Sequence, residues 1–100
     1  MILTELQHKL INAQKAKDDF RVSVLRYLLA GVKNKEIELR PLKKELGDED
    51  ILGVIKKQIK KRLEAIEQFQ TGGRQDLVDK ETREVAILKE LQQEFTPQTV

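Results

Sequence analysis

The sequence predicts an all-α protein, a four-helix bundle-like domain that comprises residues 1–100 as a single domain. Apolar residues recur at helical spacing in four segments, and no segment alternates apolar and polar residues as a half-buried strand would. One hundred residues are enough for one hydrophobic core, and a composition of 39% apolar residues is too high for a disordered chain. The helices are expected at about 4–17, 20–40, 48–70 and 75–94.

The first two helices are defined by their caps and by a proline. Thr4 and Gln7 have the spacing of a capping box, in which the Thr4 hydroxyl would accept from the Gln7 backbone N–H. The charged segment 15–19 interrupts the apolar pattern and is expected to contain the turn. Nine of the thirteen residues 20–32 are apolar or aromatic, which favours a central helix covered on more than one side. Pro41 ends this helix, because proline disfavours α geometry in the residue before it.

The third and fourth helices are separated by Gly72 and Gly73, one of which is expected to form a left-handed C-terminal cap. Three acidic residues, 48–50, stand where the positive end of the third helix dipole is expected. Together the four helices predict a core that consists of Leu6, Leu10, Val22, Leu25, Leu29, Val32, Ile55, Ile59, Leu63, Ile66, Val85 and Leu88.

The charge is distributed unevenly along the chain, although the formal net charge is only +2. Residues 1–32 carry a balance of +2, residues 33–62 of +4 and residues 63–100 of −4. Such asymmetry can orient an approaching polyanion through the summed electrostatic field. The alternative is that charges segregate by chance in a highly charged helical protein.

The densest basic run lies on the third helix, in the segment KKQIKKR at 56–62. On a helical projection Lys57 and Lys61 point away from the apolar sector, with Lys56 and Lys60 on one flank and Arg62 on the other. Two further cations, Arg26 and Lys33, run along one side of the second helix. These residues form the predicted RNA-binding set, and the alternative for such a run is an ordinary solvated helix face. Because the chain has one tyrosine and no tryptophan, RNA would be bound through its backbone and shape rather than by base stacking.

No constellation of catalytic residues is apparent in the sequence. The chain has one serine, one histidine and no cysteine, and none of its acidic residues shows metal-ligand spacing. We therefore expect no enzymatic activity, no catalytic residue, no cofactor and no metal ion. No apolar segment is long enough to cross a membrane, and neither a signal peptide nor a disulfide is expected, so a cytoplasmic protein that does not interact with membranes is predicted.

Three segments resemble the YqeY-like family, whose members are related to the tail domain of the B subunit of aspartyl/glutamyl-tRNA amidotransferase. They are KAKDDFRVSVLRYLLAGVKNKEIEL, ELGDEDILGVIKKQIKKRLEAIEQF and GGRQDLVDKE. The likeness covers nearly the whole chain and corresponds to the N-terminal subdomain of the family, which then continues into a second helical subdomain. The chain departs from the family at Gly47, where a threonine or serine cap is usual, and near its end, where Phe95-Thr96-Pro97 or Leu91-Gln92-Gln93 replaces Tyr-Leu-Pro.

The resemblance implies a helical domain that contacts tRNA while catalysis takes place elsewhere. Arg74, in the Gly-Arg-x-Asp-Leu motif, is either a phosphate contact or the local ion-pair partner of a nearby carboxylate, while Asp76 is expected to favour the N-terminus of the fourth helix. The alternative function is a protein-interaction module, with an apolar patch at 95–100 and a helical protein or translation factor as partner. An accessory role for a carbon–nitrogen ligase with glutamine as amido donor is implied only by the family label.

Overall fold

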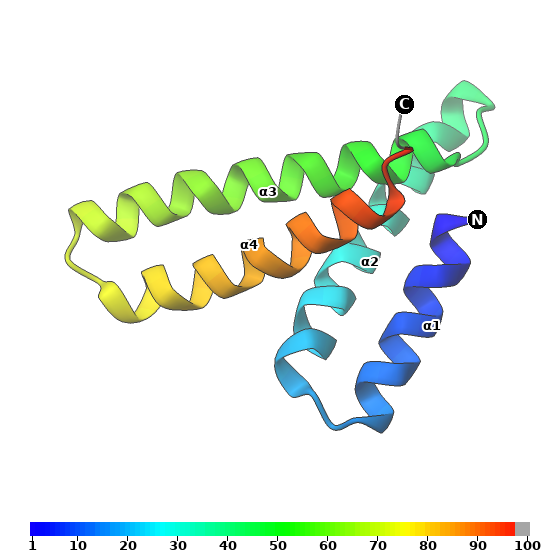
Figure 1. Ribbon diagram of the computed structural model, residues 1–100. Helices are drawn as coiled ribbons and strands as arrows, with labels where there is room; N and C mark the ends of the chain where they lie inside the picture. Colours follow the sequence, from blue (N-terminus) through cyan, green and yellow to red (C-terminus); the bar gives the residue numbers. More distant parts are fainter. Residues whose placement is uncertain (98–100) are drawn as a thin grey trace. The chain divides into compact units, whose positions relative to one another are not determined.

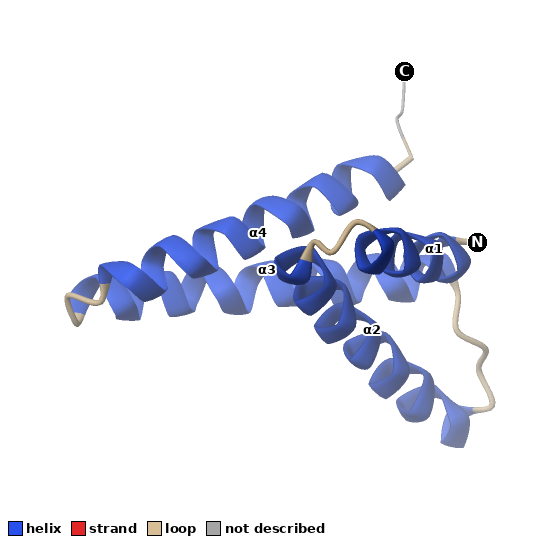
Figure 2. Cartoon of the chain, turned by 90° about the horizontal axis from the view of Figure 1, so that it is seen from below, coloured by secondary structure: helices blue, strands red, loops and turns tan. Residues whose placement is uncertain are grey.

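The computed structural model describes residues 1–97, and within that range every regular element is a helix (Figure 1). The elements are α1 (Ile2–Lys15), α2 (Asp19–Leu39), the 3-10 helix η1 (Arg40–Leu42), α3 (Asp48–Thr71) and α4 (Gln75–Phe95). Figure 2 shows no strand in the described part of the chain. The predicted all-α fold class is therefore confirmed.

The chain divides into two compact units, Met1–Val54 and Ile55–Val100. The first unit contains α1, α2, η1 and the first turns of α3, and the second contains the rest of α3 together with α4. The single domain and the central place of the second helix stay predictions.

In the first unit, α1 and α2 pack against each other and are joined by a tight turn at the predicted place. Lys17 adopts the left-handed conformation, with φ at 56°, and the Asp18 N–H donates to the Ala13 carbonyl oxygen over 3.0 Å. These features define a Schellman cap. The Asp18 carboxylate then caps α2 by accepting from the Arg21 N–H at 3.1 Å.

The predicted capping box at Thr4 is wrong. The first helix begins two residues earlier, at Ile2, and its N-cap residue Met1 makes no side-chain capping bond. Instead the Ile2 N–H donates to Asp48 Oδ1 at 3.1 Å, 46 residues away in the sequence. A carboxylate from the start of α3 therefore satisfies one of the free backbone donors at the start of α1, whereas the sequence predicted a cap between Thr4 and the Gln7 N–H.

The loop between α2 and α3 contains Pro41, as predicted, but in a short 3-10 helix rather than after an α-helical residue 40. This 3-10 helix ends at Lys43, which is left-handed with φ at 55°. At the start of α3 the Gly47 N–H donates to Asp50 Oδ2 at 2.8 Å. This bond is the reciprocal half of a capping box, and the glycine lacks only the hydroxyl that would complete it.

In the second unit, α3 and α4 lie side by side in opposite directions, as Figure 1 and Figure 2 both show. Of the two glycines predicted to cap α3, Gly73 is the left-handed one, with φ at 70°. The Arg74 N–H bonds to the Phe69 carbonyl oxygen at 2.8 Å and closes this turn. Because only residues 72–74 connect them, the end of α3 and the start of α4 lie next to each other.

Most of the predicted core is confirmed. Eight of the twelve side chains are buried, namely Leu6, Val22, Leu25, Val32, Ile55, Ile59, Val85 and Leu88. Leu10, Leu29 and Ile66 are half-buried. Leu63 is the error, because 42% of it is exposed. The buried side of α3 is rotated away from Leu63 toward Gln58, which is 8% exposed, and the ion-paired Arg62.

Candidate nucleic-acid interface

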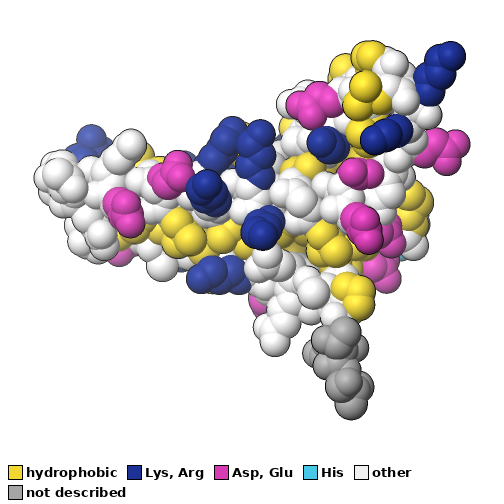
Figure 3. All heavy atoms as spheres, turned by 90° about the horizontal axis from the view of Figure 1, so that it is seen from above, with side chains coloured by type: hydrophobic (Ala, Val, Ile, Leu, Met, Phe, Trp, Pro, Cys, Tyr) yellow, Lys and Arg dark blue, Asp and Glu magenta, His cyan; other side chains and the backbone are white. Residues whose placement is uncertain are grey.

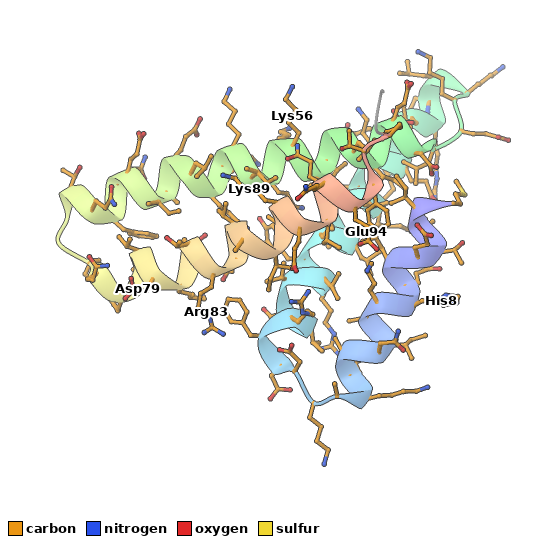
Figure 4. The ribbon with its side chains drawn as sticks, viewed as in Figure 1. His8, Lys56, Asp79, Arg83, Lys89 and Glu94 are labelled. Atoms are coloured by element: carbon orange, nitrogen blue, oxygen red, sulfur yellow. The ribbon has the colours of Figure 1, made fainter. Side chains whose placement is uncertain are left out.

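Four lysines form an exposed basic surface on the middle of α3, which we call the lysine face. Its members are Lys56, Lys57, Lys60 and Lys61. Among the described residues none of the four forms an ion pair or a side-chain hydrogen bond, so their charges are not neutralised by a neighbouring carboxylate. Figure 4 shows Lys56 projecting from α3 on the side away from α4, and basic side chains gather over the middle of the α3–α4 pair in Figure 3.

The lysine face exists because the opposite side of the same helix is anchored. Ile55 and Ile59 alternate with these lysines and are 0% and 7% exposed. With 3.6 residues per turn, Ile55 and Ile59 share one side of the helix, and Lys57 and Lys61, each two positions after one of them, lie roughly on the opposite side. The sequence therefore presents the ammonium groups to solvent in two successive turns.

Arg62, also predicted as an RNA contact, occupies a different place. Its side chain is 14% exposed and lies between α3 and α4. The guanidinium pairs with Glu81 at 3.1 Å and also with Glu84, whose side chain is 9% exposed. These contacts give Arg62 a structural role in the helix pair.

The pairing of Arg62 with two glutamates was not predicted, although the sequence contains a signal for it. Glu84 stands seven residues after Leu77 and seven before Leu91, on the side of α4 that carries the apolar residues. Arg62 stands seven residues after Ile55, which places it on the buried side of α3. Opposite charges at interior positions of two antiparallel helices favour each other as partners, because a buried charge without a partner is costly.

Arg26 and Lys33 lie on α2, in the first unit, and both are exposed. The Lys33 ammonium group donates to Glu36 Oε1 at 3.3 Å, and Arg40 donates to the same oxygen at 3.1 Å. These two cations lower the pKa of the Glu36 carboxyl below its usual value. Lys33 is therefore partly neutralised, in contrast to the lysines of α3.

Arg74 forms the local ion pair that was one of its two predicted roles. Its Nε and a terminal nitrogen donate to the two carboxylate oxygens of Asp76, at 3.2 and 3.1 Å. The hydrogen bonds from Arg74 lower the pKa of Asp76, and Asp76 in turn raises the pKa of Arg74. Both side chains are exposed, at 60% and 66%, so a phosphate group can still approach the guanidinium. Its role as a phosphate contact stays a prediction.

The single histidine and the single serine of the chain, which were not predicted to be catalytic, are exposed on separate helices. His8 lies on α1 and Ser23 on α2. Within residues 1–97 no group of three or more histidine, cysteine or acidic side chains is placed to hold a metal ion.

None of the four α helices, over the residues described, has both the length and the apolar character required to cross a membrane.

Comparison with known proteins identifies the family. The chain belongs to the Yqey-like proteins, whose family model matches residues 3–100. It is 38% identical over 87 residues to a protein of Lachancea thermotolerans named altered inheritance of mitochondria protein 41, mitochondrial, and covers 46% of that protein with 87% of its own length. The protein of the same name from Kluyveromyces lactis is 36% identical over 90 residues, which are 90% of this chain and 48% of that protein.

An uncharacterised protein of Schizosaccharomyces pombe is 33% identical over 85 residues, which are 85% of this chain and 67% of that protein. The chain spans about half the length of the first two relatives. These matches confirm the resemblance on which the family was predicted. The names of these relatives state neither a ligand nor a reaction.

Proposed function

We propose that this chain is a non-catalytic RNA-binding domain, with tRNA as its ligand, and that the lysine face of α3 contacts the RNA phosphates. The observation that carries the proposal is the set of four exposed lysines on two turns of an anchored helix, which have no carboxylate partner among residues 1–97. Lysine is a flexible point charge, and ammonium–phosphate contacts release condensed counterions from the nucleic acid. A row of such groups on a rigid helix is well suited to bind a phosphate backbone.

The aromatic residues favour contact with the RNA backbone over contact with bases. In the described part of the second unit, Phe69 and Phe95 are half-buried and no tyrosine or tryptophan is present. Single-stranded RNA is usually bound by stacking of its bases on exposed aromatic rings. The lysine face lacks such rings, so we expect binding to folded RNA with little sequence preference.

The choice of tRNA comes from the family's relationship to the amidotransferase tail domain, because the names of the relatives mention no ligand. In this proposal the domain holds the RNA and a partner supplies any chemistry, so no residue of this chain acts as a catalyst. Arg26 and Lys33 are proposed to support binding from the first unit, with Arg74 as a weaker contact. Arg62, by contrast, would act through the stability of the helix pair.

A titration of folded tRNA against the chain over a series of salt concentrations tests the proposal. The logarithm of the affinity should fall linearly with the logarithm of the salt concentration, with about −0.7 to −0.9 in slope for each neutralised phosphate. Replacing two lysines, in Lys57→Gln/Lys61→Gln, should weaken binding and make the slope shallower by about 1.4 to 1.8. The melting temperature should not change, because both side chains are exposed.

The matched control is Lys15→Gln/Lys44→Gln, which removes two exposed lysines outside the lysine face. Its net charge equals that of Lys57→Gln/Lys61→Gln. This control should keep at least most of the affinity and nearly the full slope. Negligible binding at low salt, or equal losses in the two double variants, would argue against the lysine face as an RNA site.

A protein-interaction module is the alternative function. Its predicted patch, 95–100, lies in part outside the described residues, and within it Phe95 is half-buried while Thr96 and Pro97 are exposed. Capture of a protein partner that survives nuclease treatment, together with absence of tRNA binding, would favour this alternative.

The compartment is also part of the proposal. We propose a cytoplasmic location, as the sequence predicts, while two of the relatives carry the word mitochondrial in their names. The mitochondrion is therefore the alternative compartment, and either one is compatible with a tRNA ligand.

A further inference from the structure

The exposed Leu63 marks a side of α3 that α4 leaves uncovered. Leu63 is 42% exposed, and Ile66, its neighbour one turn later, is only half-buried. The Arg62 ion pairs hold α4 against the side of α3 that carries Arg62. Leu63 lies at the edge of the apolar sector of α3 and stays exposed. A single exposed leucine is common on proteins and by itself indicates nothing.

The charged residues around Leu63 give this surface a pattern. Lys60 precedes Leu63 by three residues and Glu67 follows it by four, and both are exposed. Among the described residues neither forms an ion pair or a side-chain hydrogen bond. At 3.6 residues per turn, Lys56, Lys60, Leu63, Glu67 and Gln70 fall within about a quarter of the helix circumference. One stripe thus carries cations at one end, an apolar centre and an acidic residue at the other end.

We propose that this stripe is the interface of a symmetric dimer, in which α3 of a second copy of the chain packs antiparallel across Leu63. A two-fold axis near residues 63 and 64 places Leu63 of one protomer against Leu63 of its partner. The same axis places Lys60 opposite Glu67 twice. In a dimer of this symmetry each contact occurs in both directions, so the surface must be complementary to itself. The positions of Lys60 and Glu67 around Leu63 meet that requirement.

Other occupants fit the stripe less well. A parallel second copy would place Lys60 opposite Lys60 and Glu67 opposite Glu67, which is repulsive. A nucleic acid would gain nothing from Leu63 and would be repelled by Glu67. Lys57 and Lys61 lie on another side of α3, outside the stripe, and remain accessible in the dimer. Lys56 and Lys60 belong to both the stripe and the lysine face, so the dimer would leave Lys57 and Lys61 for RNA. The oligomeric state is measured without RNA, so its test is separate from the test of the proposed function.

The dimer is expected to be weak, because one helix pair buries less surface than a standard interface. Sedimentation equilibrium of the full chain from about 10 µM to about 1 mM should show a monomer–dimer equilibrium with a dissociation constant on the order of 0.1 mM. Leu63→Glu should leave a monomer over this range. Its melting temperature, followed by circular dichroism, should stay close to that of the unmodified chain because the side chain is exposed.

Charge reversal tests the antiparallel geometry. Lys60→Glu or Glu67→Lys alone places like charges opposite each other and should weaken the dimer about tenfold. The double variant Lys60→Glu/Glu67→Lys restores both pairs and should recover the original dissociation constant. Lys57→Glu changes the same charge outside the stripe and should have a much smaller effect. A chain that is monomeric at all concentrations, a dimer that survives Leu63→Glu, or a double variant without recovery would overturn the proposal.

Discussion

At residue 62 a guanidinium group is held between two helices with 14% of its side chain exposed, although it ends a run of lysines that face solvent. The difference arises from helical phase. Arg62 lies in line with the buried Ile55, while the neighbouring Lys61 does not. Arginine also suits this position chemically, because its planar fork can bond two carboxylates at once and it retains its charge when partly buried.

Replacement of Arg62 should be strongly destabilising. Arg62→Ala would leave the largely buried Glu81 and Glu84 without their shared cation, and breaking a buried pair in this way typically costs about 3–5 kcal/mol of unfolding free energy. Urea denaturation at pH 7 measures the loss. Lys60→Ala, on the exposed side of the same helix, should change the stability by no more than about 0.5 kcal/mol. Similar losses in the two variants would mean that the Arg62 ion pairs are not important for the fold.

At the scale of the elements, the sequence was sufficient for the helices and for most of their inward faces. Apolar spacing located all four helices, and the buried Leu25, Ile55 and Leu88 were predicted from it. Two errors, at Leu63 and Leu28, arose because a pattern within one helix does not show where the neighbouring helix packs. Leu63 was placed in the core because hydrophobicity alone defines the centre of an apolar sector, whereas ion pairs in the interior rotate the face that is buried. Leu28, fully buried, was omitted for the same lack of information about the neighbouring element.

The candidate site was predictable to a similar extent. Exposure of Lys57 and Lys61 followed directly from helical phase, and the structure agrees with it. The interior positions of Arg62 and Glu84 follow from their spacing, but the contact between them also depends on how α4 is aligned with α3, which no local pattern contains. The Ile2–Asp48 bond is of the same kind, because it links residues that are 46 positions apart.

The cap of α1 gives a prediction at this scale. Asp48→Ala removes the acceptor for the Ile2 N–H, so unfolding free energy should fall by about 1 kcal/mol, as for other lost N-caps. The matched control is Glu49→Ala, which removes one negative charge from the same first turn of α3 and therefore loses a similar interaction with the helix dipole. Hydrogen exchange should locate the difference at the first turn of α1. If Glu49→Ala has the same effect, the capping bond contributes nothing beyond charge.

For the molecule as a whole, two exposed carboxylates with cationic partners are expected to contribute to the acid dependence of stability. In the first unit Lys33 and Arg40 lower the pKa of Glu36 from its ordinary value of 4.5, and in the second Arg74 lowers that of Asp76 from 3.8. A carboxyl group with a lowered folded-state pKa adds stability above its unfolded-state pKa. That contribution is lost as the pH falls through the folded-state pKa.

The melting temperature should therefore decrease as the pH falls below about 5, which is just above the two ordinary pKa values, and should keep decreasing until both carboxyl groups are protonated in the folded state. The double variant Glu36→Gln/Asp76→Asn cannot lose these contributions, so its melting temperature should depend less steeply on pH in that window. Because both pairs are exposed, the difference should be small, and added salt should reduce it further. Glu45→Gln/Glu64→Gln, which removes two exposed carboxyl groups that lie outside the first turns of the helices, should retain the slope of the unmodified chain. If the two double variants gave the same slope, the arginine and lysine partners would not be the source of the acid sensitivity.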